Sequence, residues 1–160
     1  AAAASERPAA ADAPAREGEA AAPAPPAPQL GGAAVLVVDD DADTREIVRL
    51  QLESRGARVT AVSSVPEALA ALAGQPFAVL LADLGLPGED GYDLIRQVRA
   101  LPPERGGDTP AAALSAYTRD TDRDRALASG FQLHLAKPID HPRLAAAVAE
   151  LRELGSGRVA

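Results

Sequence analysis

From Ala33 onward, short apolar segments alternate with longer segments in which apolar residues recur at helical spacing. The apolar segments are residues 34–38, 59–62, 78–82, 111–114 and 131–135. Short, largely continuous apolar runs predict strands that are covered on both faces, as in a parallel sheet. A predicted helix follows each strand, so five strands alternate with five helices. This order predicts an α/β fold: a five-stranded doubly wound parallel sheet with right-handed crossovers and flanking helices.

The predicted helices begin and end at recognisable signals. Ser64 and Glu67 have the spacing of a capping box, in which each side chain satisfies an unpaired amide at the start of a helix. Gly56 suits the left-handed conformation that ends a helix, and Asp140 is a typical cap for the last one. The first helix carries its apolar residues at helical spacing: Ile47, Val48, Leu50 and Leu52.

Residues 1–32 differ in composition from the rest of the chain. They consist of Ala, Pro, Gly and charged residues with few others, and Leu30 is their only large aliphatic residue. Such a segment buries too little apolar surface to offset the entropy of ordering, so we predict a disordered or semi-rigid linker. The expected domain then spans residues 33–154, and residues 155–160 form a tail.

Composition and charge narrow the range of functions. The chain of 160 residues has room for one ordinary domain, and the absence of cysteine excludes disulfides and thiolate chemistry. The net charge of -7 argues against direct nucleic-acid binding. No apolar run approaches the roughly 18 residues that cross a bilayer, and the N-terminus lacks the pattern of a signal peptide, so no membrane contact is expected.

Charged and hydroxyl side chains come directly after four of the five predicted strands. Asp39 and Asp40 follow the first strand, and Asp83 follows the third. Ser115 and Lys137 follow the fourth and the fifth. Because the carboxyl ends of parallel strands meet at one edge of a sheet, these side chains are expected to converge. Clustered carboxylates repel each other unless a cation intervenes, and hard oxygen ligands suit Mg²⁺. The site is therefore predicted to carry a phosphoryl group on Asp83.

Four short motifs at these positions resemble the bacterial response regulator receiver (REC) domain, in the order and at the spacing of that family. They are Val35–Asp40 (VLVVDD), Ala82–Gly91 (ADLGLPGEDG), Leu114–Ala116 (LSA) and Leu135–Pro138 (LAKP). The resemblance covers about residues 33–154. It implies a flavodoxin-like fold of the receiver type and a role in a two-component phosphorelay.

The resemblance implies a phosphoacceptor and a metal site. Asp83 would take a phosphoryl group from a phosphohistidine of a sensor histidine kinase or of a histidine phosphotransfer protein. Asp39 and Asp40 would hold Mg²⁺ together with Asp83 and the main-chain carbonyl of Gly85. Gly85 and Tyr117 would flank the path of the water that removes the phosphoryl group.

The same resemblance implies roles for residues after the fourth and fifth strands. Lys137 would pair with the acyl phosphate, Ser115 would move in to bond it, and Pro138 would follow a cis peptide bond. Many family members carry Tyr or Phe three residues before the lysine, where this chain has His134. His134 is therefore expected to act as a weaker or pH-sensitive switch, because imidazole titrates near neutral pH.

Two other functions are the alternatives to a phosphorylated receiver. A Mg²⁺-dependent aspartyl-phosphate phosphohydrolase of the haloacid dehalogenase type carries a second acid two residues after its nucleophile, where this chain has Gly85. A receiver-like scaffold that takes no phosphate usually lacks one of the acids or the lysine, and here all are present. An EF-hand calcium loop requires glycine and glutamate where Thr44 and Leu50 stand.

The two ends of the chain suggest its context. The sequence does not begin with Met, which suggests a piece of a longer protein, and the last predicted helix ends near Leu154. With the linker ahead of the domain and no expected output module behind it, we expect the C-terminal receiver of a hybrid sensor histidine kinase. A free-standing cytoplasmic regulator is the alternative. A cytoplasmic location is expected in both cases, and a weak homodimer is left open.

Overall fold

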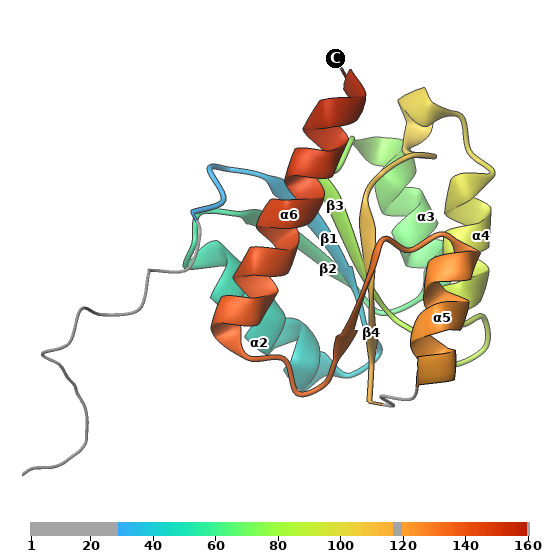
Figure 1. Cartoon of the computed structure of the whole chain (residues 1–160), viewed down its shortest axis with the longest axis horizontal. Helices are drawn as coiled ribbons and strands as arrows, with labels where there is room; N and C mark the ends of the chain where they lie inside the picture. The colour runs from blue at the N-terminus through green and yellow to red at the C-terminus, as the bar shows by residue number, and fades with distance from the viewer. Residues whose placement is uncertain (1–28, 117–119, 160) are drawn as a thin grey trace, which may run out of the picture.

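The computed structural model describes residues 29–116 and 120–159, and most of the predicted linker lies outside these ranges. The strands are β1 (Ala34–Val38), β2 (Arg58–Val62), β3 (Val79–Asp83), β4 (Ala111–Ser115) and β5 (Leu133–Ala136). The helices are α2 (Ala42–Glu53), α3 (Val65–Gly74), α4 (Gly91–Arg99), the short 3₁₀ helix η1 (Pro103–Arg105), α5 (Asp120–Ser129) and α6 (His141–Val159). The predicted alternation of strands and helices is confirmed (Figure 1).

All five strands are parallel and lie in the order β2-β1-β3-β4-β5. The chain moves from β1 to β2 in one direction and then returns to place β3 on the other side of β1. Open sheets of this kind bind ligands at the carboxyl ends of the strands where the order reverses. The topology therefore points to the carboxyl ends of β1 and β3 as the functional edge.

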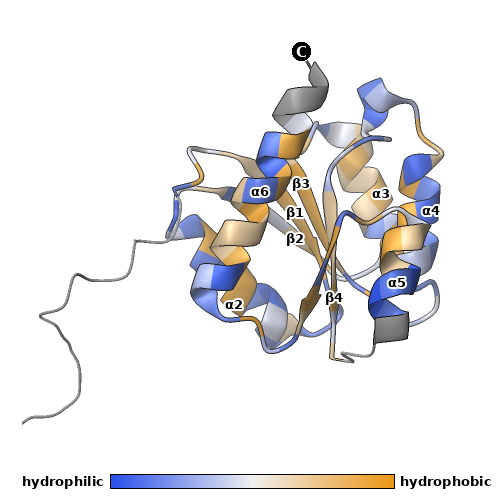
Figure 2. Cartoon of the chain, viewed as in Figure 1, coloured by the Kyte–Doolittle hydropathy of each residue, from blue (hydrophilic) through white to orange (hydrophobic). Residues whose placement is uncertain are grey.

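Two apolar layers cover the two faces of the sheet. On one face, Leu36 and Val38 of β1 pack with residues of α3, α4 and α5, and on the other face Val35 and Val37 pack with residues of α2 and α6. Figure 2 shows the hydrophobic colour concentrated in the sheet and on the helix sides that face it. In β1, β3 and β4 alternate residues are thus buried on opposite faces, which explains why these strands read as continuous apolar runs, whereas the edge strands β2 and β5 are only partly buried.

The packed structure extends beyond the predicted domain at both ends. Leu30 is fully buried among residues of α2 and α6, and its N–H donates to the carbonyl oxygen of Arg55 over 2.7 Å. A single leucine in an Ala- and Pro-rich segment is enough to fill that corner of the core. At the other end, α6 continues to Val159 instead of ending near Leu154. A Cβ atom on Gly155 would lie 3.2 Å from Pro110, so this glycine lets the helix pack closely.

The apolar residues of α2 do not all face the core. Val48 and Leu52 are buried, whereas Ile47 and Leu50 are 54% and 53% exposed. A helix that packs against a sheet on one side buries a narrow stripe at a spacing of four residues, and only Val48 and Leu52 lie on it. The expected fifth strand also shifts: β5 begins at Leu133 and not at Phe131. Within the described ranges, no helix has both the length and the apolar character that spanning a bilayer requires.

Candidate metal and phosphoacceptor site

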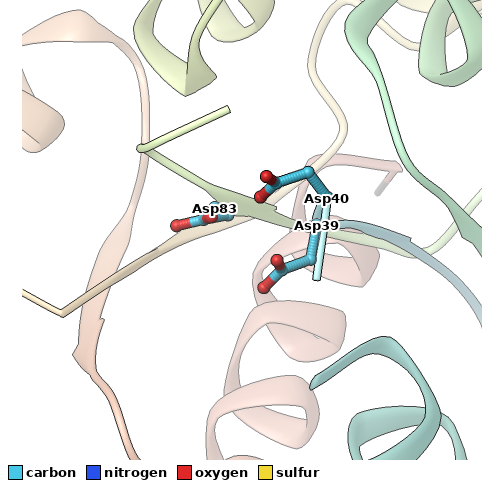
Figure 3. A group of neighbouring side chains, drawn as sticks. All are labelled: Asp39, Asp40 and Asp83. Carbon is cyan, nitrogen blue, oxygen red and sulfur yellow. The ribbon is translucent and has the colours of Figure 1, made fainter. Parts of the chain in front are cut away.

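The ends of β1 and β3 bring three carboxylates together. The two strands are neighbours, with Val38 paired to Ala82, so Asp39 and Asp83 leave the sheet side by side. Figure 3 shows the side chains of Asp39, Asp40 and Asp83 pointing to the same side. One carboxylate oxygen from each of the three residues lies within 4.8 Å of the others. The predicted convergence of these three acids is present in the structure.

The three acids differ in exposure. Asp39 is fully buried, Asp83 is 8% exposed, and Asp40 is exposed to solvent. Burial raises the pKa of the Asp83 carboxyl, and the nearby charge of Asp39 raises it further. The N–H of Gly85, 3.2 Å from Asp83 Oδ1, acts in the opposite direction. The cluster therefore combines one solvent-facing carboxylate with two buried ones.

Lys137 supplies the positive charge at the cluster. Its Nζ atom lies 2.7 Å from Asp39 Oδ2 and 3.5 Å from Asp83 Oδ1. Burial opposes the charged form of this lysine, but the hydrogen bond to Asp39 and the charge of Asp83 outweigh burial and raise the pKa of the ammonium. Lys137 thus stays charged and partly neutralises the acids from the end of β5.

Ser115 and Gly85 lie at the same edge of the sheet. Ser115 ends β4 and is 4% exposed, and its carbonyl oxygen accepts a hydrogen bond of 2.8 Å from the N–H of Lys137. A Cβ atom added to Gly85 would lie 3.9 Å from both carboxylate oxygens of Asp83 and would meet no other atom within 4 Å. Gly85 therefore leaves the approach to Asp83 open on this side, while its predicted role as a metal ligand stays a prediction.

His134 is not part of the acid cluster. It lies on β5, paired with Ala113, and its Nε2 atom is buried with no hydrogen-bond partner among the described residues. The Lys137–Pro138 peptide bond is cis, as predicted. The predicted role of Tyr117 concerns a residue that lies outside the described ranges. The predicted switch residues Ser115 and His134 therefore sit on neighbouring strands, one inside the site and one beside it.

Two residues near the cluster were not identified from the sequence. The Nη1 atom of Arg45, on α2, donates to the main-chain carbonyl of Asp39 over 2.7 Å. A Cβ atom on Gly91, the first residue of α4, would lie 2.5 Å from the carbonyl oxygen of Asp83. The sequence gives only a weak indication that Arg45 is near the site: it stands six residues after Asp39 and within the first turns of a predicted helix. The glycine has a clearer one, because it ends the glycine-containing motif Ala82–Gly91 that includes Asp83.

The donor set fits a hard divalent cation. The acid cluster offers carboxylate oxygens alone, and such oxygen ligands suit Mg²⁺ or a similar ion. Three carboxylates face one lysine, so the cluster has an excess of negative charge in the described part of the chain. The acid cluster therefore has the composition of a site for such an ion.

Comparison with known proteins gives the family of the chain. The sequence profile of the response regulator receiver domain family matches residues 35–149. An uncharacterised 14.6 kDa protein from Leptolyngbya boryana is 47% identical over 106 residues, which cover 66% of this chain and 79% of the relative. Hybrid signal transduction histidine kinase D from Dictyostelium discoideum is 34% identical over 131 residues, or 78% of this chain. The chain spans only 8% of the length of that kinase.

A solved structure supports the same assignment. The crystal structure of a putative response regulator from Chloroflexus aurantiacus J-10-fl superposes with a TM-score of 0.72 at 30% identity, and the match covers 76% of this chain and 98% of that one. The parallel sheet, the acid cluster at its carboxyl edge and the profile match over residues 35–149 agree. The protein belongs to the response regulator receiver domain family, the phosphoacceptor domains of two-component systems.

Proposed function

We propose that Asp83 is the phosphoacceptor of this receiver domain. The observation that carries the proposal is its position: a nearly buried carboxylate beside two other acids and 3.5 Å from the ammonium of Lys137. A carboxylate oxygen of Asp83 would bond to phosphorus while the P–N bond of the donor phosphohistidine breaks. The imidazole leaves with the electron pair of that bond and takes up a proton. The donor is a sensor histidine kinase or a histidine phosphotransfer protein.

The proposed metal ligands are the carboxylates of Asp39, Asp40 and Asp83 and the main-chain carbonyl of Gly85. When bound, Mg²⁺ supplies positive charge that offsets the negative charge on the phosphoryl oxygens. Lys137 adds a second positive charge, which would turn from Asp39 toward the phosphoryl group. The chain itself thus contributes mainly position and charge.

We propose that Ser115 and His134 report the phosphorylated state to partners. The hydroxyl of Ser115 would donate to the phosphoryl group, and the half-buried ring of His134 would respond on the neighbouring strand. His134→Ala tests this role. The phosphorylation-induced chemical shift changes of residues 133–136 should be smaller in the variant, and changes equal to those of the parent would overturn the role of His134.

The central experiment compares the parent with Asp83→Asn. Each protein is incubated with a small phosphodonor and Mg²⁺ and is then examined by intact mass spectrometry. The parent should gain the mass of one HPO₃ group and the variant should gain none. Asp41→Asn is a matched control, because Asp41 is an exposed acid nearby that caps α2. Equal labelling of the parent and Asp83→Asn would refute the proposal.

For the full protein, we propose a cytoplasmic receiver at the C-terminal end of a hybrid sensor histidine kinase. The match to a hybrid histidine kinase supports this context, and the match to a small protein supports a free-standing regulator instead. We further propose that residues 1–32 tether a receiver domain of residues 33–154. Leu30, which packs in the core, and the end of α6, which continues to Val159, extend the folded domain beyond these bounds. Sequencing the coding region upstream of residue 1 distinguishes the two contexts.

A further inference from the structure

Arg45 joins helix α2 to the main chain between two of the three acids. It lies near the start of α2, and its Nη1 atom donates to the carbonyl oxygen of Asp39 over 2.7 Å. The last backbone hydrogen bond from this end of β1 to β2 is donated by the N–H of Asp39 to the carbonyl oxygen of Val62. The carbonyl of Asp39 therefore lies beyond the strand ladder, and a side chain takes the place of a strand partner.

The hydrogen bond from Arg45 affects the orientation of the Asp40 side chain more than that of the Asp39 side chain. The carboxylate of Asp39 is already held at both oxygens, by the N–H of Asp41 at 2.9 Å and by Lys137 at 2.7 Å. The carboxylate of Asp40 is exposed and accepts no hydrogen bond from the described residues. The carbonyl of Asp39 and the N–H of Asp40 belong to one planar peptide unit. Arg45 thus fixes the plane from which the side chain of Asp40 departs.

We propose that Arg45 is a positioning residue for the metal site, since its hydrogen bond to the Asp39 carbonyl keeps the carboxylate of Asp40 turned toward Asp83. The inference rests on the proposed Mg²⁺ site and adds to it a residue that does not touch the ion. Without this hydrogen bond the Asp39–Asp40 peptide can rotate, and the exposed carboxylate leaves the cluster for part of the time. Partners behind the direct ligands commonly change metal affinity by about 10- to 100-fold.

The sign of the effect separates this role from simple electrostatics. The guanidinium of Arg45 carries a positive charge and contacts the main-chain carbonyl of one of the three acids, so as a charge alone it would repel a cation at the cluster. Removing it would then tighten Mg²⁺ binding. If Arg45 positions Asp40, its removal weakens Mg²⁺ binding despite the loss of a positive charge. The two roles therefore predict changes in opposite directions.

The test is the Mg²⁺ dissociation constant of Arg45→Met, measured by calorimetric titration of the folded chain. We expect binding about tenfold weaker than in the parent, toward the lower end of the range for such partners. Arg49→Met is the matched control, because Arg49 lies one turn further along α2 and its guanidinium pairs with Glu46 and Glu53. It removes the same charge and should leave Mg²⁺ binding unchanged or slightly tighter. Unchanged or tighter binding by Arg45→Met would overturn the inference.

A double substitution locates the effect at Asp40. In an Asp40→Ala background, Arg45→Met should cause no further loss of Mg²⁺ affinity, whereas two independent effects would add. In the metal-free protein, Arg45→Met should shift the amide resonance of Asp40, because the carbonyl of the same peptide loses its donor. An unshifted resonance would count against the inference.

Two further Mg²⁺ titrations, of Arg45→Lys and of the parent, complete the experiment. Arg45→Lys keeps the positive charge and a possible hydrogen-bond donor, so it should recover part of the Mg²⁺ affinity. If thermal unfolding shows that Arg45→Met does not fold, Arg45→Lys is used in its place. The amide resonance of Asp40 reports whether the lysine ammonium reaches the carbonyl of Asp39. If it does not, and Arg45→Lys still binds Mg²⁺ as tightly as the parent or more tightly, a positioning role for Arg45 is contradicted. A parent that binds no Mg²⁺ at all would refute the proposed metal site itself.

Discussion

The acid cluster and the side of the sheet formed by β5 and α5 (the β5–α5 side) differ in how completely their buried polar groups are paired. At the cluster, both carboxylate oxygens of Asp39 accept hydrogen bonds. On the β5–α5 side, the buried Nε2 atom of His134 has no partner among the described residues. Paired groups hold one geometry in advance, whereas an unpaired buried group is stabilised by rearrangement. The comparison indicates that the acid cluster is preorganised and that the β5–α5 side changes its conformation more easily.

The largest expected effect is that of Lys137→Met on the metal-free protein. The substitution leaves the buried carboxylates of Asp39 and Asp83 without their shared cation. We expect the free energy of unfolding at neutral pH to fall by about 2 kcal/mol, less than the usual cost of breaking a fully buried pair because Lys137 is partly exposed. Urea denaturation with and without Mg²⁺ measures the change. Mg²⁺ should recover most of the loss, and an equal loss in both conditions would contradict preorganisation by charge.

Asp83→Asn should instead stabilise the metal-free protein. Burial raises the pKa of the Asp83 carboxyl in the folded state, so the folded protein holds this proton more tightly than the unfolded chain does. The parent therefore loses stability as pH rises from the unfolded pKa through the raised folded pKa. We expect the variant to exceed the parent by about 1 kcal/mol at pH 7 and by less at pH 3. Paired thermal melts test this, and a difference that does not grow with pH would contradict it.

His134→Phe should reduce the pH dependence of stability on the other side of the sheet. Burial lowers the pKa of the imidazole below its ordinary value of 6.5, while Asp122 opposes the shift and Arg123 adds to it. The unfolded chain then takes up this proton more readily, so the parent loses stability as pH falls through the ordinary histidine range. We expect the difference between pH 7.5 and 5.5 to shrink by about 0.5 kcal/mol in the variant. Urea denaturation at both pH values is the measurement, and an unchanged difference would argue against a half-buried ring that is kept neutral.

The last prediction concerns Arg125→Ala, whose expected effect is also small. The guanidinium of Arg125, on α5, lies 3.8 Å from the centre of the Tyr92 ring on α4. Exposed cation–π contacts contribute about 0.5 kcal/mol, and we expect a loss of that size in urea denaturation. Arg123→Ala is the control, because its exposed pair with Asp124 at 3.9 Å should contribute less. A loss from Arg125→Ala as large as that from Lys137→Met would mean that the β5–α5 side is no easier to change.

The sheet and its acidic edge could be predicted because they depend on patterns that act over a few residues. Apolar runs such as Val35–Val38 identify strands covered on both faces, and the rules of parallel topology bring Asp39, Asp83 and Lys137 to one edge. None of these steps requires knowledge of a particular side-chain contact. The identity and order of the strand-end residues were therefore enough to predict the cluster.

Other features depend on contacts that no local pattern encodes. Ile47 and Leu50 match the helical period, yet the narrow contact between α2 and the rest of the core leaves them exposed. Leu30 lies in a segment whose composition predicts disorder, but it fills a corner that only the folded chain creates. Arg45 contacts a main-chain carbonyl, and every residue has one, so its partner could not be identified from the sequence.

The close approach of Gly91 to Asp83 limits how this protein can be redesigned. A methyl group at position 91 would lie 2.5 Å from the carbonyl oxygen of Asp83 and 2.9 Å from the Cα atom of Leu84, which is too near for any side chain. The first turn of α4 thus rests directly on the backbone of Asp83, with no flexible atoms between them. Libraries that vary the surface of α4 must keep glycine at this one position, whatever specificity they select.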